Sequence, residues 1–311
     1  MISSDSGSAG PPAIFDRTLL RARRLRAAAA GGENFLVARA AEDLAERLQA
    51  VSRRFPAALD LGTPGEALRM VLSASGRVDR VVAAEPLAAL RDTRGGPLVA
   101  AGEEALPFAE ASFDLVVSAL ALHWVNDLPG ALLQIRRVLK PHGLFIAVMA
   151  GGETLTELRQ CLAAAESEIE SGLSPRVTPF VEVRAMGTLL QRAGFALPVT
   201  DVDRLTVRYA SLAGLFRDLR AMGATNALTD RRRKPLRRST IARAAEIYAE
   251  RFADADGRLR ATFDLLWISA WAPHESQQQP LKPGSARMRL ADALGTKERS
   301  AGEKATRRHE D

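Results

Sequence analysis

The sequence predicts an α/β fold built on a twisted, mostly parallel β-sheet. Five short apolar runs have the continuous hydrophobicity of strands that are buried on both faces. Stretches with helical spacing alternate with these runs, which is typical of right-handed crossovers into a parallel sheet. Two later strand-like segments bring the expected number of strands to seven. The five runs are Ala57–Leu61, Val78–Ala84, Leu98–Ala101, Phe113–Ser118 and Leu144–Ala150, and the later strands are Leu197–Tyr209 and Arg260–Trp271.

Helical segments flank every part of this sheet. The region from Ile14 to Arg54 carries apolar residues near the i, i+3, i+4 spacing, so N-terminal helices are expected there. The last two helices of the chain form an insertion before the final strand. The helices expected after residue 54 are Glu66–Ser73, a poorly defined Ala88–Asp92, Leu128–Leu139, Glu153–Glu170, Glu182–Ala193, Leu212–Met222 and Ile241–Phe252.

These elements divide the chain into four parts. Residues 1–13 are polar and are expected to be disordered, and residues 14–56 hold the N-terminal helices. Residues 57–272 contain all seven strands and form the main domain. Residues 273–311 are dominated by Gln, Pro, Lys and Gly, which predicts a loop and then a disordered tail.

Composition limits the classes of protein to consider. Of the 311 residues, 47% are hydrophobic and 26% are charged, as in a soluble globular protein, and no apolar run is long enough to predict a membrane span. The first ten residues lack the basic and apolar regions of a secretory signal, so the cytoplasm is the expected location. The single cysteine, Cys161, excludes an internal disulfide and is expected to be a packed thiol.

The net charge of +6 is compatible with nucleic acid or anionic lipid as a partner. Much of the excess lies in Arg17–Arg26, in Arg231–Arg238 and at the C-terminus. No aromatic or glycine-rich signature accompanies these clusters. We therefore favour a solvated basic face and do not expect nucleic acid as the partner.

The turn that follows the first strand has the composition of a cofactor-binding turn. Asp60 is followed by the small-residue turn of Gly62 and Gly65, which lets backbone N–H groups approach a ligand. Glu85 lies 23 residues after Gly62, at the end of the second strand, where an acid can accept both hydroxyls of a ribose. The alternative is a tight turn with no ligand, since such glycines and acids are common.

The segments around the fourth apolar run carry a more specific resemblance. Leu106–Phe108 (LPF) and Phe113–Ser118 (FDLVVS) resemble the third and fourth strands of small-molecule class I methyltransferases. Leu122–Leu128 and Gln134–Gly143 continue this resemblance, which includes the malonyl-carrier-protein methyltransferase of biotin synthesis. It implies a Rossmann-like sheet of seven strands and S-adenosylmethionine as the cofactor.

A narrower resemblance runs from about residue 14 to residue 286. It is to the complex I assembly-factor family with protein-arginine hydroxylase activity. It implies a methyltransferase-like domain that hydroxylates an arginine on an iron–sulfur subunit of NADH:ubiquinone oxidoreductase, in mitochondria (the matrix, if the cell is eukaryotic) or in bacteria. The motifs that carry it are Ile14–Arg17, Leu122–Leu132, Gly152–Leu155, Glu157–Arg159, Ser174–Phe180, Leu189–Phe195, Asp218–Asn226, Trp271, His274–Gln277 and Pro283–Ala286.

The sequence departs from the usual methyltransferase pattern at three positions. Pro64 and Glu66 occupy the second and third glycine positions of the first motif, so a backbone donor is lost and a carboxylate approaches the place of the cofactor's own carboxylate. Gly102 replaces the acid that binds the adenine amine, and neighbouring Glu103 is the candidate to replace it. A change of register that uses Gly65 would restore the turn.

Three residues near the expected reaction centre are further candidates. Ser118 ends the fourth strand, where the carboxyl ends of parallel strands gather ligands, and is a candidate cofactor residue. His123 and Trp124 follow in the loop that borders a methyl-acceptor pocket and are the candidate catalytic residues. Their alternative role is packing. The histidines show no spacing of an iron site, so no metal ligands are proposed.

Three functions remain open from the sequence. The first is an S-adenosylmethionine-fold enzyme of the complex I assembly type that modifies an arginine of a protein partner. The second is a methyltransferase for a small acid or a carrier-bound acyl group. The third is a non-catalytic assembly chaperone, which the departures at Pro64, Glu66 and Gly102 favour.

Overall fold

The structure is a computed structural model that describes residues 13–32, 34–86, 97–170 and 172–277, together with residues 292 and 295. The expected helix at 88–92, the motif at 283–286 and most of the segments expected to be disordered lie outside the described residues. The chain divides into two units, Met1–Pro273 and His274–Asp311. The first unit contains every helix and strand discussed below.

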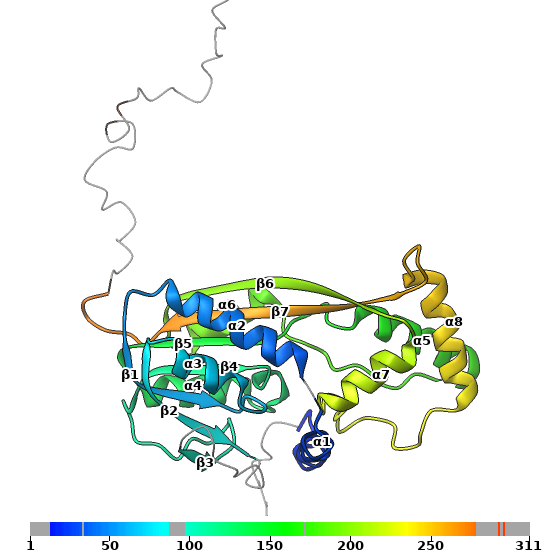
Figure 1. The fold of residues 1–311 in the computed structure, drawn as a ribbon, viewed down its shortest axis with the longest axis horizontal. Helices are drawn as coiled ribbons and strands as arrows, with labels where there is room; N and C mark the ends of the chain where they lie inside the picture. Colours follow the sequence, from blue (N-terminus) through cyan, green and yellow to red (C-terminus); the bar gives the residue numbers. More distant parts are fainter. Residues whose placement is uncertain are drawn as a thin grey trace, which may run out of the picture. The chain divides into compact units, whose positions relative to one another are not determined.

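Seven strands form one sheet in the order β3-β2-β1-β4-β5-β7-β6 (Figure 1). The strands from β3 to β5 are parallel to one another, whereas β7 is antiparallel to both β5 and β6. This confirms the predicted seven-stranded, mostly parallel sheet. The strands are β1 (Phe55–Leu61), β2 (Val78–Glu85), β3 (Leu98–Ala100), β4 (Phe113–Ala119), β5 (Leu139–Ala150), β6 (Ala196–Tyr209) and β7 (Leu259–Trp271).

The largest difference from the predicted strands is at β5, which begins at Leu139 instead of Leu144. Leu139 pairs with Phe113 before the register shifts and Leu144 pairs with Leu115. The intervening residues include Pro141 and Gly143, which interrupt the apolar pattern on which the prediction depended. The predicted strand is therefore shorter than the observed one, because the apolar pattern covers only the regular part of β5.

The predicted helices that fall on described residues are present, with changes at their ends. The N-terminal helical region is two helices, because Asp16 caps α1 at Leu19 N–H and Asn34 caps α2 at Val37 N–H. Helix α5 begins after Glu153, since residues 151–155 form a turn bonded to β7. The helices are α1 (Arg17–Ala29), α2 (Phe35–Gln49), α3 (Ala67–Ala74), α4 (Leu128–Val138), α5 (Thr156–Glu170), α6 (Val183–Arg192), α7 (Leu212–Ala221) and α8 (Arg238–Phe252), with the short helix η2 (Leu122–Trp124) before α4.

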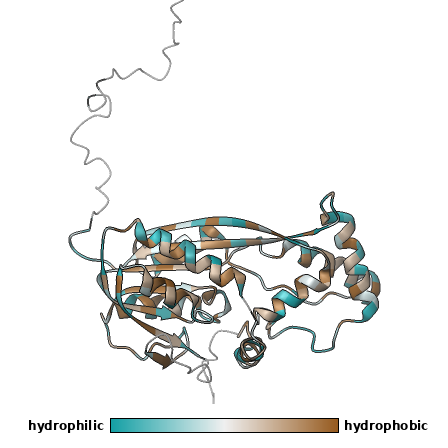
Figure 2. Ribbon diagram, viewed as in Figure 1, coloured by the Kyte–Doolittle hydropathy of each residue, from teal (hydrophilic) through white to brown (hydrophobic). Residues whose placement is uncertain are grey.

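Two hydrophobic clusters lie on the two faces of the sheet. One joins the sheet to apolar residues of α2, α3, α5, α7 and α8, and the other joins it to α4 and α6. Figure 2 shows the central strands as largely hydrophobic. Cys161 is buried in the first cluster, and burial raises the pKa of its thiol to about 11, which confirms the predicted packed thiol. Among the described residues, no helix has both the length and the apolar character that a membrane span requires.

A third, smaller cluster fixes the N-terminus against the loop after β4. Phe15 and Leu20 pack with Trp124, Ala227 and Leu228. Phe15 N–H also donates to the side-chain oxygen of Asn126 at 2.7 Å. This contact places α1 across the carboxyl ends of the parallel strands, where the candidate site residues lie.

Candidate cofactor and substrate site

The turn after β1 retains two glycines in the left-handed region. Gly62 has φ +69° and Gly65 has φ +76°. Gly62 N–H donates to the carbonyl of Ala84 at 2.8 Å, and the hydroxyl oxygen of Thr63 accepts from Ala119 N–H at 2.9 Å. The turn is thus tied to both β2 and β4, and Gly65 supplies the second glycine that Pro64 does not.

Substitution of the two glycines by alanine is expected to lower the free energy of unfolding by different amounts. A Cβ at Gly62 would lie 2.7 Å from Oε1 of Glu103, whereas nothing lies within 4 Å of one at Gly65. Gly65→Ala should therefore lower the free energy of unfolding by only about 1–2 kcal/mol, the cost of a left-handed alanine. Gly62→Ala should lower it by more, because the contact with a buried carboxylate adds to the same strain. Chemical denaturation of both variants measures this difference, and equal losses would contradict the described packing.

Glu85 lies at the carboxyl end of β2 with its carboxylate incompletely satisfied. It is 5% exposed, and its Oε1 has no hydrogen-bond partner among the described residues. Burial raises the pKa of Glu85 to about 7, although the nearby charge of Arg24 opposes the shift. Glu85 lines a cavity of about 640 Å³ together with Pro64 and Gly65. A buried acceptor that faces a cavity beside this turn fits the ribose of S-adenosylmethionine.

Asp60 is a second buried acid beside the same turn, near the end of β1. It is 2% exposed, and its Oδ1 also has no partner among the described residues. Burial raises the pKa of Asp60 to about 7, and a hydrogen bond from Thr63 opposes this shift. Asp60 is absent from the lining of the cavity described above, so it contributes to the site through the turn and through its charge on Glu85.

Glu103 lies closer to the turn than its sequence position indicates. It is fully buried and forms an ion pair with Arg17 of α1, and its Oε1 lies 2.7 Å from the place that a Cβ on Gly62 would take. This Oε1 has no hydrogen-bond partner among the described residues. The structure therefore gives Glu103 a contact with the turn and with α1, and Gly102 forms a bridge to Ala105.

The candidate residue Ser118 forms a hydrogen bond within the sheet. Its side chain is fully buried, its hydroxyl donates to the carbonyl of Leu61 at 2.8 Å, and it lines neither of the cavities described here. The small hydroxyl residue joins β4 to β1. Its position at a strand end resembled that of a ligand-binding residue, but its rotamer bonds the neighbouring strand.

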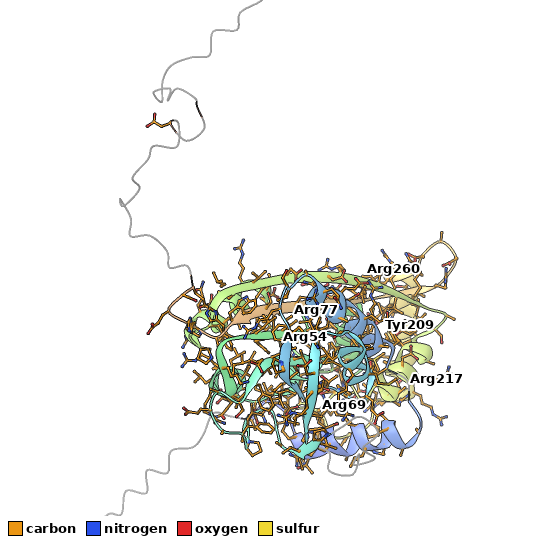
Figure 3. The ribbon with its side chains drawn as sticks, turned by 60° about the vertical axis from the view of Figure 1, so that its left-hand side comes forward. Arg54, Arg69, Arg77, Tyr209, Arg217 and Arg260 are labelled. Atoms are coloured by element: carbon orange, nitrogen blue, oxygen red, sulfur yellow. The ribbon has the colours of Figure 1, made fainter. Side chains whose placement is uncertain are left out.

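Two buried arginines complete the cofactor cavity, and the sequence analysis missed both. Arg69 of α3 lies 3.8 Å from the Glu66 carboxylate and donates to the carbonyl of Gly65 at 3.4 Å (Figure 3 labels Arg69). Its positive charge offsets Glu66, which sequence reasoning had placed in conflict with the cofactor's carboxylate. Arg24 of α1 is 7% exposed and lines the same cavity.

Arg24 has the more unusual surroundings. Burial lowers the pKa of its guanidinium, and the charges of Glu103 and Glu85 oppose that shift. No hydrogen bond of this guanidinium is found among the described residues. The buried positions of α1 are Leu20, Arg24 and Ala27. This i, i+4, i+7 spacing places an arginine on the buried stripe of a helix, which is the signal that could have identified it from the sequence.

A second cavity, of about 430 Å³, adjoins the first. Both are lined by Arg24, Asn34, Pro64 and Met222, so the two cavities meet at these residues. The second cavity is mainly apolar, and neither Asp nor Glu is among the residues that line it. It extends from the end of β4 between α5, α7 and the loop before α8, the usual position of an acceptor pocket beside the cofactor.

The predicted residues His123 and Trp124 both line this second cavity. Nδ1 of His123 accepts weakly from Ala150 N–H at 3.4 Å, and its ring packs edge-on against Phe180. Burial, and then the charge of Arg24, lower the pKa of His123 to about 3, so the imidazole is neutral at physiological pH. Trp124 packs edge-on against Phe15. Together these rings form an uncharged aromatic wall.

The described residues contain no group of three or more His, Cys, Asp or Glu side chains arranged to hold a metal ion. The candidate site consists of the two joined cavities. One is bordered by a glycine turn, an acid and two arginines. The other is bordered by aromatic and aliphatic side chains.

Comparison with known proteins supports these assignments. A family model described as a methyltransferase domain matches residues 59–147. A candidate methyltransferase from Bacillus halodurans has the same fold, with a TM-score of 0.52, 17% identity, and coverage of 75% of this chain and all of that one. The domain match and the fold indicate S-adenosylmethionine as the cofactor.

Relatives with higher identity cover nearly the whole chain. The mitochondrial arginine-hydroxylase NDUFAF5 of Danio rerio is 40% identical over 287 residues, which are 90% of this chain and 89% of the relative. The Homo sapiens protein of the same name is 40% identical over 294 residues, 91% of this chain and 84% of the relative. A malonyl-[acyl-carrier protein] O-methyltransferase of Xylella fastidiosa is 39% identical over 168 residues, 54% of this chain and 55% of that protein. The chain belongs to the arginine-hydroxylase NDUFAF5 family.

Proposed function

We propose that this enzyme hydroxylates an arginine of a protein partner, an iron–sulfur subunit of respiratory complex I, during assembly of that complex. The observation that carries the proposal is the junction of the two cavities, where a site for S-adenosylmethionine meets an aromatic pocket in a chain of this family. The enzyme would act where that subunit matures, in the mitochondrial matrix or the bacterial cytoplasm.

The reaction replaces one C–H bond of the arginine side chain by a C–OH bond. With dioxygen as the oxidant, one oxygen atom enters the product, and two electrons and two protons from an external donor convert the other to water. S-adenosylmethionine supplies a sulfonium cation and an activated methyl group when bound. In this proposal Glu85 holds its ribose hydroxyls, the turn at Gly62–Gly65 holds its methionine part, and Arg24 faces its carboxylate.

His123 and Trp124 would hold the aliphatic and planar parts of the target arginine. A guanidinium packs favourably over aromatic faces. The neutral state of His123 matters here, because a protonated imidazole would repel the cation entering beside it. Their rings also exclude water from the pocket.

Deletion of the gene in its own organism tests this proposal. The expected result is loss of assembled complex I and of the extra oxygen mass on one arginine of the iron–sulfur subunit, with both restored by the wild-type chain. Mass spectrometry of the subunit measures the modification directly. Normal hydroxylation and normal complex I in the deletion strain would reject the function.

The raised pKa of Glu85 predicts that cofactor affinity depends on pH. Below pH 7 the unliganded carboxyl is protonated, and a carboxylate that accepts two ribose hydroxyls must lose that proton on binding. Affinity should therefore rise about tenfold between pH 5.5 and 7, with proton release. Calorimetry in buffers of different ionisation enthalpy counts the protons. Glu85→Gln should abolish this dependence and Asp60→Asn should retain it; the reverse would assign the proton to Asp60.

One observation favours a second function. The apolar lining of the acceptor cavity, with Arg24, Arg176 and Arg220 and without any acid, also suits a carrier-bound acyl chain that ends in a carboxylate. Transfer of a labelled methyl group from S-adenosylmethionine to such an acyl group would support it. The preserved turn and the open crevice favour an enzyme over the chaperone alternative, for which the absence of S-adenosylmethionine binding at millimolar concentration would be needed.

A further inference from the structure

The positive charge of this protein is concentrated in one segment. Residues 217–238 contain eight Lys and Arg residues and two Asp residues, so this segment alone accounts for the net charge of +6. The segment comprises the second half of α7, the loop that leads to α8 and the first residue of α8 (Figure 1). It lies next to the acceptor cavity, since Arg220, Pro235 and Leu236 are among the residues that line it.

The loop is anchored by two of its own arginines. Arg231 pairs with Asp16 at 3.0 Å, and Arg232 pairs with Glu170 of α5. The hydroxyl of Ser174 also accepts from Arg232 N–H at 3.2 Å. These contacts hold the loop backbone beside the mouth of the cavity.

Six other cations of the segment are exposed and form no ion pair among the described residues. We call them the cationic rim, and Figure 3 shows one of them, Arg217, at the outer edge of the molecule. The cationic rim consists of Arg217, Arg220, Arg233, Lys234, Arg237 and Arg238.

Exposed aliphatic side chains accompany the cationic rim. Leu173, 70% exposed, directly precedes the Ser174 that bonds the loop, and Ile241 is exposed while also lining the cavity. Apolar side chains surrounded by charged ones are typical of protein–protein interfaces. Surfaces for single-stranded nucleic acid instead present aromatic platforms, and residues 217–238 contain no aromatic residue.

The charges of the cavity and of the cationic rim restrict which arginine can enter. A target arginine is a cation, and the acceptor cavity offers it no Asp or Glu and three arginines. An approach to these six cations, which form no ion pair among the described residues, is unfavourable unless the target carries compensating charge. We propose that the cationic rim docks an acidic segment of the protein partner, so that the enzyme selects an arginine flanked by Asp or Glu. This rests on the proposed function.

A peptide-binding experiment on the full chain tests this. The probes are fluorescent peptides of equal length with a central arginine flanked by glutamates, glutamines or lysines, together with an oligouridylate. The variant is Lys234→Glu/Arg237→Glu/Arg238→Glu. The matched control is Arg80→Glu/Arg184→Glu/Arg192→Glu, which changes the net charge equally at exposed cations outside the segment.

The wild-type chain should bind the glutamate peptide about tenfold or more tightly than the glutamine peptide, with an affinity that falls as salt rises. The rim variant should lose this preference and the control should keep it. Equal affinities of the two variants for the glutamate peptide would overturn the proposal. So would tighter, rim-dependent binding of the oligouridylate, which would assign the surface to nucleic acid.

A fourth peptide separates this inference from the proposed function. With lysine in place of the central arginine and the glutamates unchanged, binding to the cationic rim should persist, because the flanking acids provide the attraction. Rim-dependent binding combined with normal hydroxylation in the deletion strain would reject the arginine hydroxylase and leave the acidic docking surface in place. The expected loss of hydroxylation in the deletion strain, combined with peptide binding that does not depend on the cationic rim, would support the arginine hydroxylase and reject the acidic docking surface.

Discussion

Replacing Glu85 by alanine is expected to lower the affinity for S-adenosylmethionine by about 10²- to 10⁴-fold, because two hydrogen bonds to a charged acceptor contribute roughly 1.5–3 kcal/mol each. The structure gives the reason for such a large effect. Oε1 of Glu85 is buried without a hydrogen-bond partner among the described residues, so a ligand hydroxyl would satisfy this atom. Titration calorimetry with the purified variant measures the change.

The Glu85→Ala variant is expected to fold normally, so its lower affinity for S-adenosylmethionine would not reflect unfolding. The carboxylate of Glu85 is already disfavoured by burial, as its raised pKa shows, so its removal should leave the free energy of unfolding unchanged or higher. Glu110→Ala provides the control, since Glu110 is exposed in the loop before β4 and lines neither cavity. An affinity of the Glu85→Ala variant within threefold of wild type would show that the ribose lies elsewhere.

The sequence predicted the sheet because its signals are local. Each parallel strand is an apolar run of its own, and each crossover has helical spacing, so all seven strands could be placed before their order was known. Glu85 could be predicted for the same reason, since a fixed number of residues separates the end of β1 from the end of β2. The irregular start of β5 could not, because Pro141 and Gly143 hide it.

The remaining parts of the site depend on contacts between distant segments. Glu103 lies within 3.0 Å of the place that a Cβ on Gly62 would take and pairs with Arg17, and these three residues come from three different parts of the chain. Ser118 lies near the end of β4, and the partner of its hydroxyl, the carbonyl of Leu61, belongs to another strand. The spacing within α1 places Arg24 on the buried face of that helix, but it does not report which crevice this face lies against.

Replacing Arg24 by methionine is expected to weaken S-adenosylmethionine binding by about 10- to 10²-fold, the scale of one charged hydrogen bond. Methionine keeps the length and apolar stem of the side chain and removes only the guanidinium. This guanidinium is buried between two cavities and has no hydrogen bond among the described residues, so a bound anion would supply one. The proposal identifies that anion as the carboxylate of the cofactor.

A decarboxylated analogue of S-adenosylmethionine makes the test specific. If Arg24 holds the carboxylate, the wild-type chain should prefer the complete cofactor, and Arg24→Met should remove that preference with little effect on the analogue. Equal losses for both ligands would mean that Arg24 shapes the crevice without contacting the carboxylate. The preference of Arg24→Lys for the complete cofactor should lie between those of the wild type and Arg24→Met, since lysine keeps the charge but not the planar donor pair. Thermal unfolding of each unliganded variant establishes first that folded proteins are compared.

The same substitution has a consequence for pH that a purely steric role of Arg24 would not produce. The charge of Arg24 lowers the pKa of Glu85 against the larger effect of burial, so its removal should move that pKa further above 7. The pH at which cofactor affinity reaches its plateau should then move upward in Arg24→Met and stay in place in Arg24→Lys. If this pH moved equally in Arg24→Met and Arg24→Lys, the charge of Arg24 would not be what lowers the pKa of Glu85. The electrostatic coupling of the two residues at the junction of the cavities would then be rejected.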